Sequence, residues 1–136
     1  MPNHFHLLIK QLKDRGITEF LSKLSNSYTK FYNTKYKRIG PLFQGQFKAV
    51  LIESDEQLIH VSRYIHLNPI ASYLTKDLNS YEWSSYREYT SNIPGLCNKE
   101  EIMGFFNSPQ KYEQFCLDQI SYAQDLERIK HQLIDE

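Results

Sequence analysis

The chain has 136 residues, of which 40% are hydrophobic and 24% charged, as is usual for a folded domain. This length suffices for one domain with a buried core. No apolar run is long enough to cross a membrane and no signal peptide opens the chain, so we expect a cytoplasmic protein without a membrane partner. The two cysteines, Cys97 and Cys116, lie too far apart in the sequence to indicate a zinc site or a disulfide framework.

The formal net charge is zero, but the charges are segregated along the chain. Up to Lys76 there are 11 Lys+Arg against 5 Asp+Glu, and from Asp77 onward there are 5 against 11. A basic half joined to an acidic half is the asymmetry expected of a protein that meets phosphate on one face. Solvated surface charge that happens to segregate would explain the same counts.

The first part of the chain is predicted to alternate between strands and a helix. A compact apolar run predicts a strand over His4–Gln11. From Ile17 an apolar stripe at helical spacing predicts a helix that continues into the basic segment Tyr32–Arg38 and breaks at Ile39–Pro41. Leu42–Glu53 is predicted to be extended or a strand, with a glycine that permits a bulge.

A second helix is predicted to begin at Ser54, whose side chain can cap the backbone while Gln57 reaches back to it. This helix is expected to end or kink near Leu67, because Pro69 disfavours a helical conformation of the residue before it. The remaining elements are a predicted aromatic-rich loop, Asn79–Tyr89, and two predicted helices, Lys99–Phe106 and Lys111–Leu133.

Two groups of residues could carry chemistry. On a strand, His4 and His6 point to the same face, so both imidazoles could reach one divalent ion while Phe5 faces the core. A pair of incidental histidines is the alternative, since two ligands do not make a metal site.

On the second helix, His60, Tyr64 and Asn68 follow one another at intervals of four and would share a face. A tyrosine beside a metal-bound phosphate could act as a covalent nucleophile, and an amide oxygen could complete the ligands of the metal. Tyr64 could equally be a packing residue and Asn68 a turn residue before proline. His66 falls on another face of the helix and is interpreted as structural.

Three motifs occur together in this order: Met1–Leu8 (MPNHFHLL), Arg63–Pro69 (RYIHLNP) and Trp83–Tyr86 (WSSY). Jointly they resemble the REP-associated tyrosine transposases, which are single-tyrosine HUH transposases of the insertion-sequence type. The resemblance extends from Met1 to about Tyr89.

The resemblance implies roles for particular residues. His4 and His6 would be the HUH ligands of Mg²⁺ or Mn²⁺, Asn68 the third ligand, and Tyr64 the nucleophile. The WSSY run, which contains Trp83, would be a packing feature of the family. The residues implied to lie toward DNA are Lys35, Tyr36, Lys37, Arg38 and Arg63.

The implied fold is α+β: a partial ferredoxin-like HUH domain over residues 1–89, with an antiparallel sheet and helices on one face, followed by a helical C-terminal extension over residues 90–136. Family members carry a strand, a helix and a second strand before the HUH strand, so the resemblance implies that this N-terminal segment is missing. Sheet edges exposed in this way would favour a homodimer.

The implied function is a DNA transposase that cuts and rejoins single-stranded hairpin DNA through a 5′-phosphotyrosine. The alternatives are an inactive remnant that only binds nucleic acid and a metal-dependent hydrolase that uses water. Aromatic residues among lysines could stack on unpaired bases, although packing within a helix explains them as well. These aromatic residues are Tyr28, Phe31, Tyr32 and Tyr36.

Overall fold

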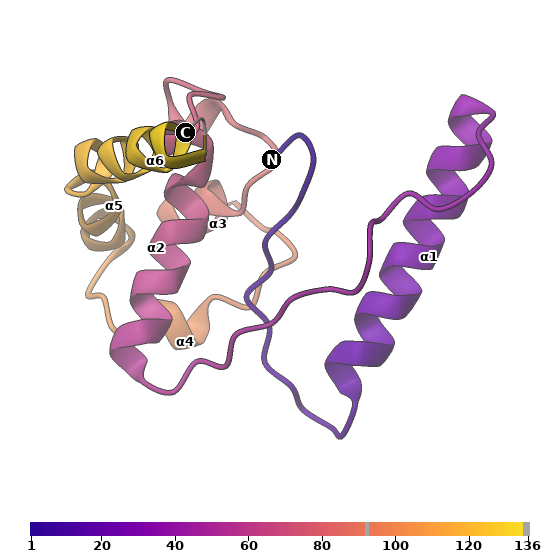
Figure 1. The fold of residues 1–136 in the computed structure, drawn as a ribbon. Helices are drawn as coiled ribbons and strands as arrows, with labels where there is room; N and C mark the ends of the chain where they lie inside the picture. Colours follow the sequence, from indigo (N-terminus) through magenta and orange to yellow (C-terminus); the bar gives the residue numbers. More distant parts are fainter. Residues whose placement is uncertain (92, 135–136) are drawn as a thin grey trace. The chain divides into compact units, whose positions relative to one another are not determined.

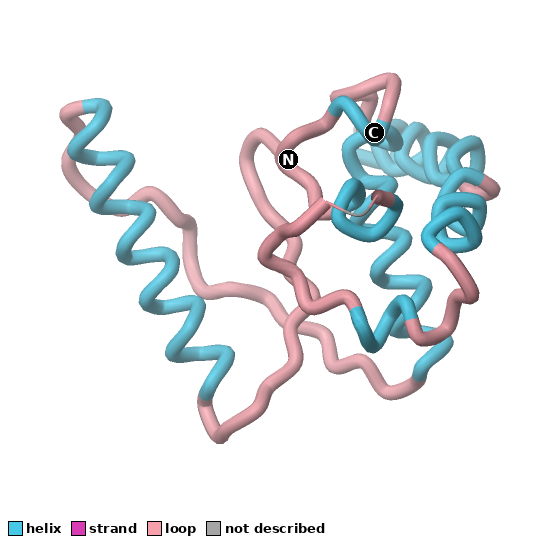
Figure 2. Tube along the Cα trace, turned by 180° about the vertical axis from the view of Figure 1, so that it is seen from behind, coloured by secondary structure: helices cyan, strands magenta, loops and turns pink. Residues whose placement is uncertain are grey.

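The structure, a computed structural model, describes residues 1–91 and 93–134, and this part of the chain is all-α (Figures 1 and 2). The helices are α1 (Gly16–Tyr36), α2 (Asp55–Ala71), the short 3₁₀ helix η1 (Leu78–Ser80), α3 (Tyr86–Thr90), α4 (Glu100–Met103), α5 (Pro109–Leu117) and α6 (Ile120–Ile134). None of these helices is long and apolar enough to cross a membrane.

The predicted α+β, ferredoxin-like class is therefore wrong, since no strand forms in the described residues. Both segments predicted as strands, His4–Gln11 and Leu42–Glu53, lack regular secondary structure. An apolar run becomes a strand only when a neighbouring strand satisfies its backbone N–H and C=O groups. Most apolar residues of the second segment are exposed instead, with Val50 84% exposed.

The chain forms two compact units, one made of residues 8–51 and the other of residues 1–7 and 52–136. We call them the α1 unit and the α2 unit. The predicted domain boundary at residue 89 falls inside the α2 unit, where α5 and α6 both pack on α2.

In the α1 unit, helix α1 ends where the sequence predicts. Lys37 adopts a left-handed conformation (φ 52°), and its backbone N–H donates to the carbonyl of Asn33. The Asn33 side chain then holds the following turn, because its amide donates to the Gly40 carbonyl and its oxygen accepts from Arg38. The predicted apolar stripe is present on α1, but of the apolar residues on this helix only Leu21 is fully buried.

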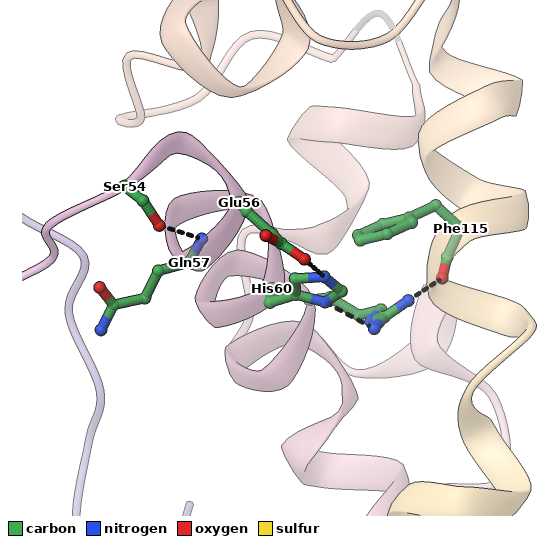
Figure 3. Close-up of polar contacts among 6 residues, drawn as sticks. Ser54, Glu56, Gln57, His60 and Phe115 are labelled. Atoms are coloured by element: carbon green, nitrogen blue, oxygen red, sulfur yellow. Dashed lines mark hydrogen bonds and ion pairs between the residues drawn. The ribbon is translucent and has the colours of Figure 1, made fainter.

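In the α2 unit, helix α2 begins at the predicted cap. The Ser54 hydroxyl accepts from the Gln57 backbone N–H at 3.1 Å (Figure 3). The Gln57 side chain accepts in turn from the backbone N–H of Glu53. The helix does not end near Leu67 as predicted but continues through Pro69 to Ala71. Burial of Leu67, Pro69 and the following residues in the core stabilises this last turn and offsets the missing proline N–H.

The core of the α2 unit lies where η1, α4, α5 and α6 pack on α2, and where α3 packs on α5 and η1 (Figure 1). The segment predicted as one helix over Lys111–Leu133 forms two helices, α5 and α6. Helix α5 begins with Ser108 as its cap and Pro109 in its first turn. The buried hydrophobic residues of this unit are Leu67, Ile70, Ala71, Leu78, Tyr86, Tyr89, Ile102, Tyr112 and Cys116.

Candidate functional site

The two predicted histidine ligands lie together on the N-terminal segment of the α2 unit. The rings of His4 and His6 meet edge to face, with their centroids 5.0 Å apart. Two imidazoles that share one ion, with metal–nitrogen distances near 2.1 Å, place their ring centroids at about this separation. Phe5, which was expected to face a core, is 48% exposed, because the segment is not a strand of a sheet.

Asn3 orients the first of these rings, a role that was not predicted. Its side-chain oxygen accepts a hydrogen bond from Nδ1 of His4 at 2.7 Å. A ring that donates from Nδ1 presents the lone pair of Nε2, the tautomer that a metal ligand needs. An amide side chain directly before a candidate ligand is the signal that would have indicated this role.

His6 is suited to the neutral state in which imidazole binds metals. Burial lowers its pKa from the ordinary value, and the positive charge of His4 lowers it further. Both effects disfavour the imidazolium form, so the lone pair of the ring is available at neutral pH.

Tyr64 joins the histidine pair from helix α2. Its ring meets that of His6 edge to face, with centroids 5.9 Å apart, and it is 50% exposed. The structure therefore brings His4, His6 and Tyr64 together from segments that are far apart in the sequence. A half-exposed tyrosine beside the His6 imidazole is accessible to a substrate as large as a nucleic acid.

Asn68 lies one turn beyond Tyr64 because α2 continues through Pro69. Its backbone carbonyl accepts from Ser72, and its side chain is half-buried. Asn68 and Tyr64 are thus four residues apart on one helix, as the role of third ligand requires. The part of the chain that the structure describes holds no cluster of three or more His, Cys, Asp or Glu side chains able to bind a metal.

Arg63, which was expected to lie toward DNA, is engaged within the protein. Its guanidinium lies 4.1 Å from the centre of the Phe115 ring and donates to the Phe115 carbonyl. It also contacts Nδ1 of His60 at 2.8 Å, and burial lowers its pKa from the ordinary value. Figure 3 shows the contact between Glu56 and His60, with Phe115 near the same histidine. The contacts of Arg63 join α2 to α5, so a role in binding DNA has no support from its geometry.

The other residues predicted to contact DNA lie at the C-terminal end of α1, in the α1 unit. Lys35, Tyr36, Lys37 and Arg38 are all exposed. Lys35 lies over the rings of Phe31 and Tyr36, and Arg38 lies over the ring of Tyr32.

His66 is structural, as predicted. It is 3% exposed and bridges two hydroxyls, that of Tyr112 at 2.7 Å from Nδ1 and that of Ser85 at 2.9 Å from Nε2. Of the WSSY run, Ser85 and the buried Tyr86 do pack in this core. Trp83 does not, since it is 79% exposed.

No family model, curated protein or solved structure matches this chain.

Proposed function

We propose that this chain is a metal-dependent single-strand DNA endonuclease and strand transferase of the HUH transposase type, with Tyr64 as its nucleophile. One observation carries the proposal: an exposed tyrosine on α2 lies beside a pair of facing histidines from the N-terminal segment. Two of the three motifs on which the resemblance rests, MPNHFHLL and RYIHLNP, contribute these same residues. Such an enzyme would act in the cytoplasm, on DNA in single-stranded or hairpin form.

In the proposed reaction the Tyr64 hydroxyl oxygen attacks the phosphorus of a phosphodiester and loses its proton. The bond between phosphorus and the 3′ oxygen breaks, and that oxygen takes up a proton to become a free 3′-hydroxyl. The product on the protein is a 5′-phosphotyrosine. Because this ester retains the energy of the broken bond, a second 3′-hydroxyl can attack it, release Tyr64 and join a new strand.

His4 and His6 fit an ion such as Mg²⁺ or Mn²⁺, with the Asn68 amide oxygen as the proposed third ligand. When bound, such an ion would neutralise part of the phosphate charge. Asn3 would hold His4 in the correct tautomer, and the lowered pKa of His6 would keep its ring neutral.

A second candidate is a protein that binds nucleic acid without cutting it. It is favoured by the irregular backbone of the segment that carries His4 and His6. Among the described residues, no strand pairs with this segment to hold it in place. Catalytic groups act efficiently only when their supports are rigid, so a loosely held pair of ligands would lower activity steeply.

The test is to incubate the full chain with labelled single-stranded hairpin DNAs and Mg²⁺ or Mn²⁺, then to resolve the products on denaturing gels. We expect a metal-dependent protein–DNA adduct that survives denaturation. Tyr64→Phe should abolish the adduct, and His4→Ala combined with His6→Ala should reduce it at least about a hundredfold.

Tyr122→Phe is the matched control, since Tyr122 is also an exposed tyrosine on a helix of the same unit. It should leave the adduct unchanged. Cleavage that persists in Tyr64→Phe would point to a hydrolase that uses water. DNA binding without any adduct would favour the second candidate.

A further inference from the structure

The α1 unit has a net positive charge, and the α2 unit a net negative one. Residues 8–51 contain 9 Lys+Arg and 2 Asp+Glu, whereas the α2 unit contains 7 and 14. The first unit thus has a formal charge of +7 and the second of −7, although the complete chain is neutral. A charge of this sign and size on a short segment favours a polyanionic partner.

Exposed aromatic rings line the C-terminal half of α1 among these cations. Tyr28, Phe31 and Tyr36 are each about half exposed. The rings form a continuous series, in which Tyr28 contacts Phe31, Tyr32 and Phe43, and Tyr32 contacts Tyr36 at 4.5 Å between centroids. About half of the surface of each of these three residues remains exposed, so their rings retain faces on which a partner can pack.

The cations and the rings are interleaved at close range. Lys35 lies 5.7 Å from the Phe31 centroid and 5.3 Å from that of Tyr36, and the Arg38 guanidinium lies 5.7 Å from the Tyr32 centroid. Beside them is an open groove of about 380 Å³ lined by Lys30, Phe31, Thr34 and Lys35.

We infer that this surface, the aromatic–basic face of α1 (Lys30, Phe31, Tyr32, Lys35, Tyr36 and Arg38), binds single-stranded nucleic acid. Unpaired bases would stack on the exposed rings of Phe31 and Tyr36, while the cations contact phosphates on either side. Stacking of this kind discriminates against a duplex, whose bases already stack on one another. A purely apolar partner would leave the lysines unpaired, and an acidic protein would leave the rings without stacking partners.

The aromatic–basic face of α1 would be the strand-binding surface of the proposed transferase, and to that extent the inference rests on the proposed function. Its test nevertheless requires no chemistry. Fluorescence anisotropy of a labelled single strand is measured with full-length Tyr64→Phe protein in EDTA, so that neither cleavage nor metal contributes. The affinity is then measured for the same sequence as duplex DNA and as single-stranded RNA. The comparison with RNA shows whether the face prefers single-stranded DNA or single-stranded RNA.

We expect the single strand to bind more tightly than the duplex. In this background Phe31→Ala should weaken binding by about 5- to 100-fold, the range found when one stacking residue is removed. Phe20→Ala is the matched control: Phe20 is a similarly exposed phenylalanine of the same helix, distant in sequence from the lysines of the face. It should leave the affinity within about twofold, because a substitution away from the face removes no ring on which a base stacks.

Equal binding of duplex and single strand would overturn the inference, as would an unchanged affinity in Phe31→Ala. If the protein sediments as a dimer, and both Phe31→Ala and Phe20→Ala dissociate that dimer, then the face would instead be a contact between two copies of this chain. Failure of the proposed transferase function can be distinguished from failure of this inference. If only the transferase function fails, no covalent adduct forms, but single strands still bind.

Discussion

His66 illustrates how burial determines the chemistry of a single residue. It lies in the α2 unit among the rings of Tyr86, Tyr89 and Tyr112, and both ring nitrogens contact hydroxyl groups. Burial lowers its pKa to about 4. A neutral imidazole satisfies both hydroxyls in either tautomer, whereas an imidazolium here would be a charge removed from water.

We therefore predict that acid destabilises the fold through His66. The unfolded chain binds a proton on this residue near pH 6.5 and the folded chain only near pH 4, so the unfolded state holds more protons between these values. The free energy of unfolding should fall as the pH is lowered from 6.5, losing about 3 kcal/mol once the pH is below 4. Urea titrations at a series of pH values measure this loss.

Two histidine variants separate this effect from the titration of carboxylates. His66→Gln should show a smaller loss of stability over the same pH range. His60→Gln, at an exposed histidine of the same helix, should keep the loss found in the wild type. Parallel pH dependence in the wild type and His66→Gln would contradict the prediction.

At the scale of elements, one buried hydroxyl links α5 to α2. The Tyr112 hydroxyl contacts His66 and, at 3.1 Å, Ser62, both of which belong to α2. Burial raises the pKa of Tyr112 well above its ordinary value, so it acts as a neutral hydrogen-bonding group. Arg63 adds a second polar connection between the same two helices.

Tyr112→Phe should lower the free energy of unfolding by about 1–3 kcal/mol, because it removes the hydrogen-bond partner of the buried Nδ1 of His66, whereas Ser62 keeps its bond to the Ile59 carbonyl. Tyr86→Phe is the matched control. The Tyr86 hydroxyl is buried and has no hydrogen-bond partner among the described residues, so its removal should leave stability unchanged or slightly higher. Chemical denaturation compares the two variants, and equal losses of stability would contradict the assignment of these roles.

At the scale of the whole molecule, the neutral net charge conceals two units of opposite charge. The affinity for nucleic acid should therefore depend on which unit a lysine belongs to, and not on the total charge of the protein. Phosphate contacts release counterions, so each contact adds to the salt dependence of binding.

Replacing Lys30 and Lys35 with glutamine should weaken single-strand binding. It should also reduce the slope of log affinity against log salt by about 0.7 for each phosphate that the variant no longer neutralises. Replacing Lys76 and Lys111 with glutamine changes the net charge equally, but in the α2 unit. This second pair should keep the wild-type slope. Equal effects of the two pairs would show that only overall charge matters.

Features encoded within a few neighbouring residues could be predicted from the sequence. The Ser54 cap and the end of α1 before Ile39–Pro41 depend on local hydrogen bonds and backbone conformation, and both are confirmed. The proximity of His4 to His6 is also local, and the rings lie together although the predicted strand is absent. The structural role of His66 followed from its place on a helix face different from that of Tyr64.

Features that depend on distant residues were decided only by the tertiary structure. The predicted strands needed partners that no other described segment supplies, so the fold is all-α. Helix α2 continues through Pro69 because its last turn is buried. Arg63 contacts Phe115 of α5, and the local sequence pattern could not predict that α5 lies beside α2. The same holds for Tyr64, whose approach to His6 joins segments that only the folded chain brings together.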